Sequence, residues 1–392
     1  MEFSQDRSWS CYPNGIAHSR RRFMHVLGAA AAVSTLRPET LLFSQEQDDD
    51  ESVPAFPKGG FPEGSTRLNF NENPLGPSPK VLQALLDEGL RDGNRYNYID
   101  PLIDAIAKHH DLPSANVVAG CGSTEFLQFA PWAFLKSGSS LVLPVPSYGY
   151  AAGVAEGIGA KVIRVPLGPL GTVDTTAMKK AIRRNTRIVY LANPNNPTGA
   201  VLPLEAIRPL AQALPRDSIL FVDEAYNDFL PDKGAIELVR EGMPVLVTRT
   251  FSKAHGLAGL RLGYAMAPDA VMKQLKTVWW GDFGINAAAR IAGPAALDDE
   301  AHVESYVRVI DQGLSQLRGG LEKMGHKPYP HRAPFFMVDL GRTAKPIMVA
   351  LYKQKIYVQD GNNWKMPNFL RVSVGLPDEN EVFLKAMREL SV

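Results

Sequence analysis

From about residue 66 onward, short apolar runs alternate with stretches of helical character, and this alternation constrains the fold more than any other feature of the chain. Short strands that alternate with helices form a largely parallel sheet covered by helices. The chain is therefore predicted to have an α/β fold with a mostly parallel sheet. The predicted strands are residues 141–143, 162–165, 188–192, 219–222, 245–248 and 262–266.

The pattern changes towards the C-terminus. Residues 288–319 have the composition of a helix, and strands and turns are predicted after them, ending at residues 369–375. A chain of 392 residues is long enough for two or three folding units of about 150 residues each. We therefore expect a second, smaller domain to begin near residue 290.

Charge and cysteine content argue against two classes of protein. Lys and Arg number 42 and Asp and Glu number 41, so the net charge is only +1. Proteins that neutralise nucleic-acid phosphates instead concentrate Lys and Arg. The two cysteines, Cys11 and Cys121, cannot form a disulfide framework, and neither lies in a pattern of metal ligands. We expect no nucleic-acid partner and no metal site, and we expect Cys121 to be a small buried residue, not a nucleophile.

The N-terminal segment resembles a bacterial twin-arginine export signal. Residues 19–25 read SRRRFMH, and a short, weakly apolar run follows at 26–33. That run is shorter than the roughly 20 apolar residues of a membrane span. Residues 1–45 are therefore predicted to direct export to the periplasm or beyond through the twin-arginine machinery, with no membrane span. The alternative is a basic turn leading into an ordinary amphipathic helix, in which case the protein is cytoplasmic.

The segment behind the predicted signal has the composition of a linker. An acidic run at 46–51 precedes closely spaced Pro and Gly residues at 54–64. Such a segment buries too little apolar surface to form a core of its own. Residues 46–65 are interpreted as a solvated linker.

Four motifs carry the chemistry of the remaining chain. They are NPNNPTG at 193–199, DEAY at 223–226, TFSK at 250–253 and GLRLGY at 259–264. The first three each follow a predicted strand, and ligands of open α/β sheets bind at the carboxyl ends of strands. Together the motifs resemble those of fold-type I pyridoxal-phosphate (PLP) enzymes, specifically the class I/II aminotransferases and their histidinol-phosphate aminotransferase branch. The resemblance extends from about Leu68 to the C-terminus.

The resemblance implies a fold and a division into domains. It predicts a large PLP-binding domain at residues 96–289, whose mostly parallel sheet is flanked by helices. It also predicts a smaller α+β domain, formed by an N-terminal arm at 66–95 and a C-terminal segment at 290–392.

The catalytic residues implied by the resemblance are Lys253, Asp223 and Tyr226. Lys253 would form the imine with PLP and, once displaced by a substrate amine, carry the proton between the substrate Cα and the cofactor. Asp223 would keep the ring nitrogen protonated, so that the ring accepts electrons. Tyr226 and Asn196 would donate hydrogen bonds to the phenolic oxygen of the ring.

The phosphate of PLP needs several donors, and the chain offers two groups of them. Three residues precede a helix that is predicted to begin near Glu125, where backbone N–H groups favour an anion. Hydroxyls and a guanidinium come from the third and fourth motifs. The residues are Gly122, Ser123 and Thr124 in the first group and Thr250, Ser252 and Arg261 in the second. Tyr148 resembles the aromatic residue that stacks over the ring, although a Tyr after a strand is more commonly a packing residue.

Other residues imply a partner chain and a substrate. Tyr96 matches the tyrosine that reaches the cofactor phosphate of the neighbouring subunit, so a homodimer is expected. Arg371 matches the arginine that binds the carboxylate of the substrate or the phosphate of histidinol phosphate. Asn73, in the arm, would line the substrate side. The branch has a second arginine about a dozen positions before Arg371, but this chain has Gln359 there, and a neutral amide cannot replace a charged bidentate contact.

The predicted function is the transfer of an amino group between an amino acid, or a histidinol-phosphate-like amine, and a 2-oxo acid. A decarboxylase or other lyase remains an alternative, since both use the same cofactor machinery. A non-catalytic binding protein is a third interpretation. It is disfavoured because such a protein has no need of Lys253, Asp223 and Arg261 together.

Overall fold

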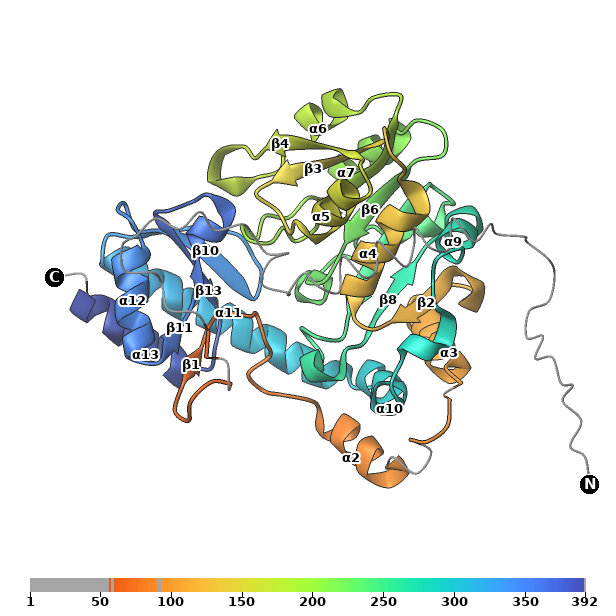
Figure 1. Cartoon of the computed structure of the whole chain (residues 1–392). Coiled ribbons are helices and arrows are strands. Elements are labelled where there is room, and N and C mark those ends of the chain that lie inside the picture. Colours follow the sequence, from red (N-terminus) through yellow and green to blue (C-terminus); the bar gives the residue numbers. More distant parts are fainter. Residues whose placement is uncertain (1–55, 58–59, 90–92, 97, 391–392) are drawn as a thin grey trace, which may run out of the picture. The chain divides into compact units, whose positions relative to one another are not determined.

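A computed structural model of the chain describes residues 56–57, 60–89, 93–96 and 98–390 (Figure 1). The predicted export signal at 1–45 and the first part of the predicted linker lie outside the described residues. None of the described helices is both long and apolar enough to cross a membrane.

A seven-stranded sheet forms the largest element of the fold, in the order β2-β8-β7-β6-β5-β3-β4. Its strands run parallel except β8, which is antiparallel to both of its neighbours. This confirms the prediction of a mostly parallel α/β sheet. The strands are β2 (Val117–Gly120), β3 (Ser140–Val145), β4 (Lys161–Pro166), β5 (Thr186–Ala192), β6 (Ile219–Asp223), β7 (Val245–Thr250) and β8 (Gly263–Met266).

One strand of this sheet escaped prediction. β2 contains four buried residues, Val-Val-Ala-Gly, and two of these are too small to mark a strand by hydrophobicity. Its antiparallel partner β8 returns from β7 through a short loop without a crossover helix. The paired β2 and β8 therefore complete one side of the sheet.

Helices cover both faces of the large sheet. Alternate strand residues point to opposite faces, so each face has its own apolar core. One core includes residues of α2 (Pro79–Glu88), α3 (Asp100–His109), α6 (Thr175–Ala181), α7 (Leu204–Gln212), α8 (Ile236–Arg240) and α10 (Ala287–Leu297). The other includes residues of α4 (Ser123–Phe134), α5 (Tyr150–Gly157) and α9 (Asp269–Leu275).

A smaller antiparallel sheet lies beside the large one in Figure 1, with the order β12-β13-β10-β9. Its strands are β9 (Lys327–Pro328), β10 (Phe335–Asp339), β12 (Gln359–Asp360) and β13 (Phe369–Ser373). A short parallel pair joins the arm to the C-terminal segment, β1 (Thr66–Arg67) with β11 (Ile356–Tyr357). These elements share a third core with α11 (Glu300–Lys323), α12 (Lys345–Lys353) and α13 (Pro377–Leu390).

The helical segment predicted at 288–319 is two helices, because the chain breaks between α10 and α11 at Asp298 and Asp299. Residues 369–375 are also not the last element. Pro377 occupies the first helical position of α13, where its fixed backbone angle favours a helix start.

Candidate active site

The predicted site residues gather where the carboxyl ends of β5, β6 and β7 face the smaller sheet. Asp223 is the last residue of β6 and Thr250 the last residue of β7, while Asn196 follows β5. Lys253 lies in the loop after β7, and Arg371 lies on β13. Side chains from three strands of one sheet and one strand of another therefore face a common space.

Lys253 contributes an amine to this common space. Its Nζ donates a hydrogen bond to the backbone oxygen of Phe70 at 2.8 Å and lies 5.9 Å from the ring centre of Tyr226. Desolvation lowers the pKa of Lys253 to about 8, and the Arg371 guanidinium adds to this effect. About a tenth of the amine is therefore neutral, and so nucleophilic, at pH 7, far more than for an ordinary lysine.

Asp223 is a buried carboxylate with weak side-chain partners. The nearest hydroxyls are Thr248 Oγ1 at 3.3 Å and Tyr190 OH at 3.4 Å. Burial raises the pKa of Asp223 to about 6, against the opposing effect of these hydroxyls. A carboxylate in this condition has capacity for a further, charged donor.

A second cluster has the chemistry of an anion site. Ser123 begins α4, and its neighbour Gly122 has a φ of +76°. A Cβ atom at Gly122 would lie 2.4 Å from Nη2 of Arg261, so only glycine lets the guanidinium approach this helix N-terminus. Arg261 Nη1 is 3.4 Å from Ser252 Oγ.

Hydroxyl groups complete this cluster. Thr250 Oγ1 donates to Ser252 Oγ at 3.0 Å, and Thr124, in the first turn of α4, is half-buried. The cluster thus combines a helix N-terminus, hydroxyls and a guanidinium, which together bind phosphate groups well.

Tyr148, Asn196 and Tyr226 lie near Asp223 and Arg371, each in its own setting. Tyr148 is half-buried, and desolvation raises its pKa to about 12, with Asp223 as the next contribution. Asn196 Oδ1 accepts a hydrogen bond from Arg371 Nη1 at 2.7 Å. Tyr226 OH accepts one from the side-chain amide of Asn71 at 2.9 Å.

Arg371 is a buried cation between two aromatic rings. Its Cζ lies 5.1 Å from the ring centre of Trp364 and 5.3 Å from that of Phe335. Nη2 donates to the backbone oxygen of Asn69 at 2.5 Å, but Nε has no partner among the described residues. Burial lowers the pKa of Arg371 to about 10. The guanidinium is therefore still charged at neutral pH and has a free donor for an anion.

Gln359 is the cross-strand neighbour of Arg371. The two residues are directly paired in the antiparallel register of β12 and β13, so their side chains share one face of the small sheet. The Gln359 side-chain oxygen accepts a hydrogen bond from Asn363 at 3.1 Å. The position beside the buried guanidinium thus holds a neutral amide.

The arm contributes Asn73. Its Nδ2 donates to the backbone oxygen of Ala254 at 2.9 Å, and its Oδ1 accepts from the backbone of Leu75 at 2.9 Å. These bonds hold the arm against the residue that follows Lys253.

A profile of the protein family described as "Aminotransferase class I and II" matches residues 63–387. The chain belongs to the class I and II aminotransferases.

Curated relatives of this aminotransferase agree with the family. It is 34% identical to the histidinol-phosphate aminotransferase of Moorella thermoacetica, over 83% of this chain and 85% of the relative. It is 37% identical to histidinol-phosphate aminotransferase 2 of Pseudomonas aeruginosa, over 83% of this chain and 89% of the relative.

Solved structures agree with the fold. The histidinol-phosphate aminotransferase of Sinorhizobium meliloti, solved in complex with pyridoxal-5'-phosphate, has a TM-score of 0.77 and 26% identity, covering 83% of this chain and 90% of that one. The L-threonine-O-3-phosphate decarboxylase of Porphyromonas gingivalis has a TM-score of 0.71 at 22% identity, which shows the shared fold alone. The fold-type I prediction is confirmed, and the aminotransferase uses PLP as its cofactor.

The residues of the aminotransferase fit this cofactor. Lys253 offers an amine with a lowered pKa, and the under-bonded carboxylate of Asp223 suits a protonated ring nitrogen. The close approach of Arg261 to Gly122 forms a cradle that a Cβ atom would fill. These features match the aldehyde, the ring nitrogen and the phosphate of PLP.

Two further residues that the sequence singled out, Tyr96 and Cys121, are exposed. Tyr96 is exposed and packs against the exposed Phe283, with ring centres 5.2 Å apart. Cys121 is exposed, so the prediction that it is buried is wrong. It follows the last residue of β2 in the turn to α4, where the chain leaves the core.

Residues that the motifs did not single out also contact the site. Asn69, Phe70, Ser373 and Trp364 reach Arg371, Lys253 or Asn71. Asn69 and Phe70 lie four and three positions before Asn73, and Ser373 lies two positions after Arg371, so their place in the sequence gave only a weak signal.

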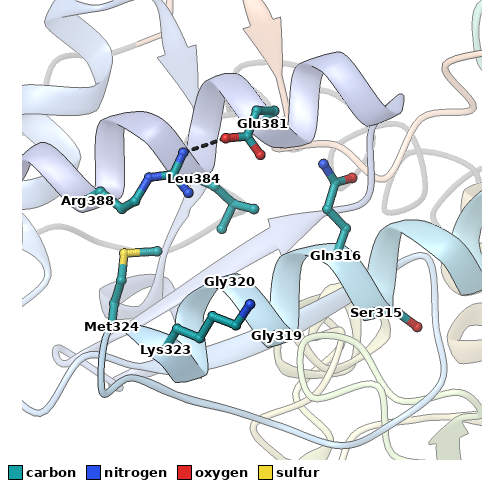
Figure 2. Close-up of a pocket in the computed structure, with 9 residues that line it drawn as sticks. All are labelled: Ser315, Gln316, Gly319, Gly320, Lys323, Met324, Glu381, Leu384 and Arg388. Atoms are coloured by element: carbon teal, nitrogen blue, oxygen red, sulfur yellow. Dashed lines mark hydrogen bonds and ion pairs between the residues drawn. The ribbon is translucent and has the colours of Figure 1, made fainter.

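A separate groove of 420 Å³ lies between α11 and α13 (Figure 2). Its lining includes Gln316, Lys323 and an ion pair between Glu381 and Arg388. None of the predicted site residues of the aminotransferase lines this groove.

Proposed function

We propose that this aminotransferase exchanges an amino group between an L-amino acid and a 2-oxo acid in a ping-pong cycle, with Arg371 holding the carboxylate of the substrate. The observation that carries the proposal is the buried Arg371 guanidinium, whose Nε lacks a partner in the described part of the chain and whose cross-strand neighbour is the neutral Gln359.

Lys253 moves the proton. When bound, PLP supplies an aldehyde that condenses with amines and a ring that withdraws electrons from the substrate Cα. Because desolvation lowers the pKa of Lys253 to about 8, Nζ can remove the Cα proton near neutral pH and return it on the cofactor side.

Asp223 and its neighbours orient the ring. The Asp223 carboxylate would accept the N–H of the ring nitrogen, which is a charged donor, in addition to its long contacts with Thr248 and Tyr190. Tyr226 and Asn196 would donate hydrogen bonds to the ring oxygen, and Tyr148 would stack on the ring. These assignments are supported by the burial of the residues around Asp223 and Arg371.

The cluster around Arg261 anchors the phosphate. Its guanidinium and the hydroxyls supply charge-assisted hydrogen bonds, and the N-terminus of α4 supplies backbone donors. The members of this cluster are Gly122, Ser123, Thr124, Thr250, Ser252 and Arg261.

The substrate carries one terminal anion. Arg371 can bind a carboxylate in a bidentate manner, and the charge on one carboxylate is matched by one guanidinium. A phosphate dianion would need a second cation, whereas Gln359 offers only an amide. The relatives named histidinol-phosphate aminotransferase make histidinol phosphate the substrate to test against amino acids. Asn73 holds the arm on the substrate side.

A homodimer completes the site. Four large aromatic side chains, Tyr96, Tyr98, Trp280 and Phe283, are each at least 69% exposed, and such surfaces mark contacts between proteins. Pairing through this surface would let Tyr96 reach the phosphate cluster of the neighbouring subunit. The division at 66–95, 96–289 and 290–392 is proposed on the resemblance to fold-type I enzymes. Export directed by residues 1–45 is proposed on the separate resemblance of that segment to a twin-arginine signal.

A panel of amino donors and 2-oxo acids tests the proposed function, with histidinol phosphate included and products resolved as exchanged amine or carbon dioxide. We expect amine exchange, with kcat/KM for at least one L-amino acid above that for histidinol phosphate. A strong preference for histidinol phosphate would contradict the single-anion substrate. Release of carbon dioxide without amine exchange would contradict the reaction.

A further inference from the structure

A chain of buried hydrogen bonds connects the strand that carries Arg371 to the phenol of Tyr226. Its members are Ser373 on β13, Asn71 in the arm and Tyr226 after β6. Their exposed fractions are 2%, 2% and 6%. Water therefore has little access to these bonds.

Each proton in this chain has a defined place. The backbone N–H of Asn71 can only donate, and it donates to Ser373 Oγ at 2.9 Å. The Ser373 hydroxyl must therefore direct its own hydrogen elsewhere, and Asn71 Oδ1 lies 2.7 Å away as its acceptor. With Oδ1 occupied in this way, the amide presents Nδ2 to Tyr226.

The orientation of the amide fixes what Tyr226 can do. Asn71 Nδ2 donates to Tyr226 OH at 2.9 Å. A phenol oxygen that accepts from an amide keeps its own hydrogen for a third group. Ser373 therefore determines, through Asn71, that Tyr226 donates its hydrogen into the site.

The backbone around Asn71 supports this arrangement. Asn71 has a φ of 54°, in the left-handed region that asparagine tolerates better than most residues. This conformation lets its backbone N–H and its side-chain oxygen both reach one hydroxyl. The arm is also tied to β13 by the backbone bond from Ser373 N to Leu68 O at 2.9 Å.

We propose that Ser373 and Asn71 are positioning residues that orient the hydroxyl of Tyr226 as a donor to the ring oxygen of the cofactor. The proposal rests on the proposed placement of Tyr226 at that oxygen. A donor there favours the anionic oxygen and so lowers the pH at which the visible absorbance of the holoenzyme changes. This midpoint is measured without substrate and does not depend on turnover.

The charged groups near Tyr226 are Asp223 at the end of β6, Lys253 in the loop after β7 and Arg371 on β13. The titratable phenols that interact with it are those of Tyr148, Tyr190 and Tyr306. A substitution at Ser373 leaves all of these groups in place. A change in the midpoint therefore reports the orientation of the phenol and not the loss of a charge.

The experiment compares absorbance titrations of purified holoenzymes. Ser373→Ala removes only the hydroxyl, and we expect the midpoint to rise by about 0.5–1 pH unit, the size of one buried hydrogen bond. Ser373→Thr keeps the hydroxyl and is expected to stay close to the wild type. Asn71→Asp replaces the donor with an acceptor and adds a negative charge, and both effects should raise its midpoint further, so the orientation of the phenol itself is read from Ser373→Ala.

A matched control is Ser218→Ala. Ser218 is also a buried serine, and its hydroxyl donates to Thr186 O at 2.7 Å, remote from the hydrogen-bond chain. We expect its midpoint to be unchanged. If Ser373→Ala and Asn71→Asp lower the thermal stability but leave the midpoint at the wild-type value, the two residues have a structural role only and the proposal is wrong.

Tyr226→Phe separates this inference from the proposed function. We expect the largest rise in the midpoint for this variant. If Tyr226→Phe raises the midpoint while Ser373→Ala and Asn71→Asp do not, the positioning role fails and the placement of Tyr226 stands. If Tyr226→Phe itself has no effect, Tyr226 is not the donor to the ring oxygen, and the placement and the positioning role both fail.

Discussion

Asp223 and Glu224 are consecutive buried carboxylates with opposite surroundings. Glu224 accepts two hydrogen bonds from Arg249, at 3.0 and 2.8 Å, and one from the backbone N–H of Ala235 at 2.5 Å. Asp223 accepts from the hydroxyls of Thr248 and Tyr190 at 3.3 and 3.4 Å and from the backbone N–H of Ala225, and it has no charged donor among the described residues. Arg249, in turn, also donates to the backbone oxygen of Lys233 at 2.7 Å.

The difference separates a structural charge from a functional one. Burial raises the pKa of both carboxyls, but the Arg249 guanidinium opposes this for Glu224. An ion pair that satisfies both of its members holds β6 against β7 and leaves nothing for a ligand. A buried carboxylate with long contacts is satisfied only when a donor from outside arrives. Removing the charge of Glu224 should therefore mainly reduce stability, and removing the charge of Asp223 should mainly reduce activity.

The largest effect is expected at Lys253, which belongs to the functional class. Lys253→Ala should lower turnover by at least about 1000-fold, because it removes the base that carries the Cα proton. Transamination assays on the holoenzyme measure this. Lys80→Ala is the control, since Lys80 lies in an exposed ion pair with Asp298 and should keep wild-type turnover. Full turnover of Lys253→Ala would remove the proposed mechanism.

The carboxylate pair gives the sharpest test of the comparison. Glu224→Gln leaves the Arg249 guanidinium buried without its counter-charge, and should lower the free energy of unfolding by about 3–5 kcal/mol. Asp223→Asn should lower kcat/KM by about 100-fold or more with a smaller loss of stability. Denaturant unfolding and steady-state kinetics on both variants check this. Equal losses of stability in the two variants would show that the distinction does not hold.

Asp223 should make the stability of the apoenzyme depend on pH. Burial raises the pKa of Asp223 from its ordinary 3.8 to about 6 in the folded apoenzyme. The folded state then binds the proton more tightly than the unfolded state. This contribution to stability is present below about pH 4 and is lost as the pH rises through about 6.

Apoenzyme should therefore lose stability relative to Asp223→Asn between pH 4 and pH 6, by up to about 3 kcal/mol. Thermal unfolding of both proteins across this range measures the difference. A constant difference across the range would show that Asp223 is not desolvated as described.

A gain of function is expected at Gln359. Gln359→Arg places a second guanidinium on the face that carries Arg371, and a charged hydrogen bond of about 1.5–3 kcal/mol corresponds to roughly a 10- to 100-fold gain. We expect kcat/KM for histidinol phosphate to rise relative to that for a carboxylate donor. Gln359→Lys is a matched control with charge but no planar fork, and should gain less. An unchanged ratio for Gln359→Arg would remove Gln359 from substrate selection.

The smallest effect is expected for an exposed charge. Lys80 and Asp298 form an ion pair at 3.1 Å with side-chain exposures of 53% and 83%. Asp298→Asn should change the free energy of unfolding by less than about 1 kcal/mol and leave turnover unchanged. A large loss of stability, measured by denaturant unfolding, would contradict the idea that partner number and burial decide the role of a charge here.

The sequence alone predicted most strands of the large sheet and the position of the motifs at their ends. All six predicted strands coincide with β3 to β8, and Asp223 and Thr250 lie at strand ends as the parallel sheet requires. Two features of the fold escaped prediction because their signals are weak. The short, small residues of β2 form a strand only through pairing with β8, and α13 has a polar first turn after Pro377.

The surroundings of the site residues depend on contacts that local patterns do not contain. Arg371 meets Asn196 and Asn69, which lie 175 and 302 positions away in the sequence. The pairing of Gln359 with Arg371 is likewise a property of strand register, which a single sequence does not encode visibly. The prediction that Cys121 is buried was wrong for a related reason. Cys121 lies one residue beyond the buried strand β2, where the chain leaves the core. The roles of the site residues towards PLP remain predictions.

The reversed direction of β8 sets a limit on evolutionary and engineered change in this molecule. Since the chain turns back from β7 directly into β8, one loop at residues 251–262 carries both Lys253 and Arg261. The distance between the Lys253 amine and the Arg261 guanidinium is thus set by the conformation of this one loop and not by the spacing of strands in the sheet. Residues added between α7 and β6 would lengthen only a connecting turn, whereas a single residue inserted at 254–260 would change the spacing between the two cations.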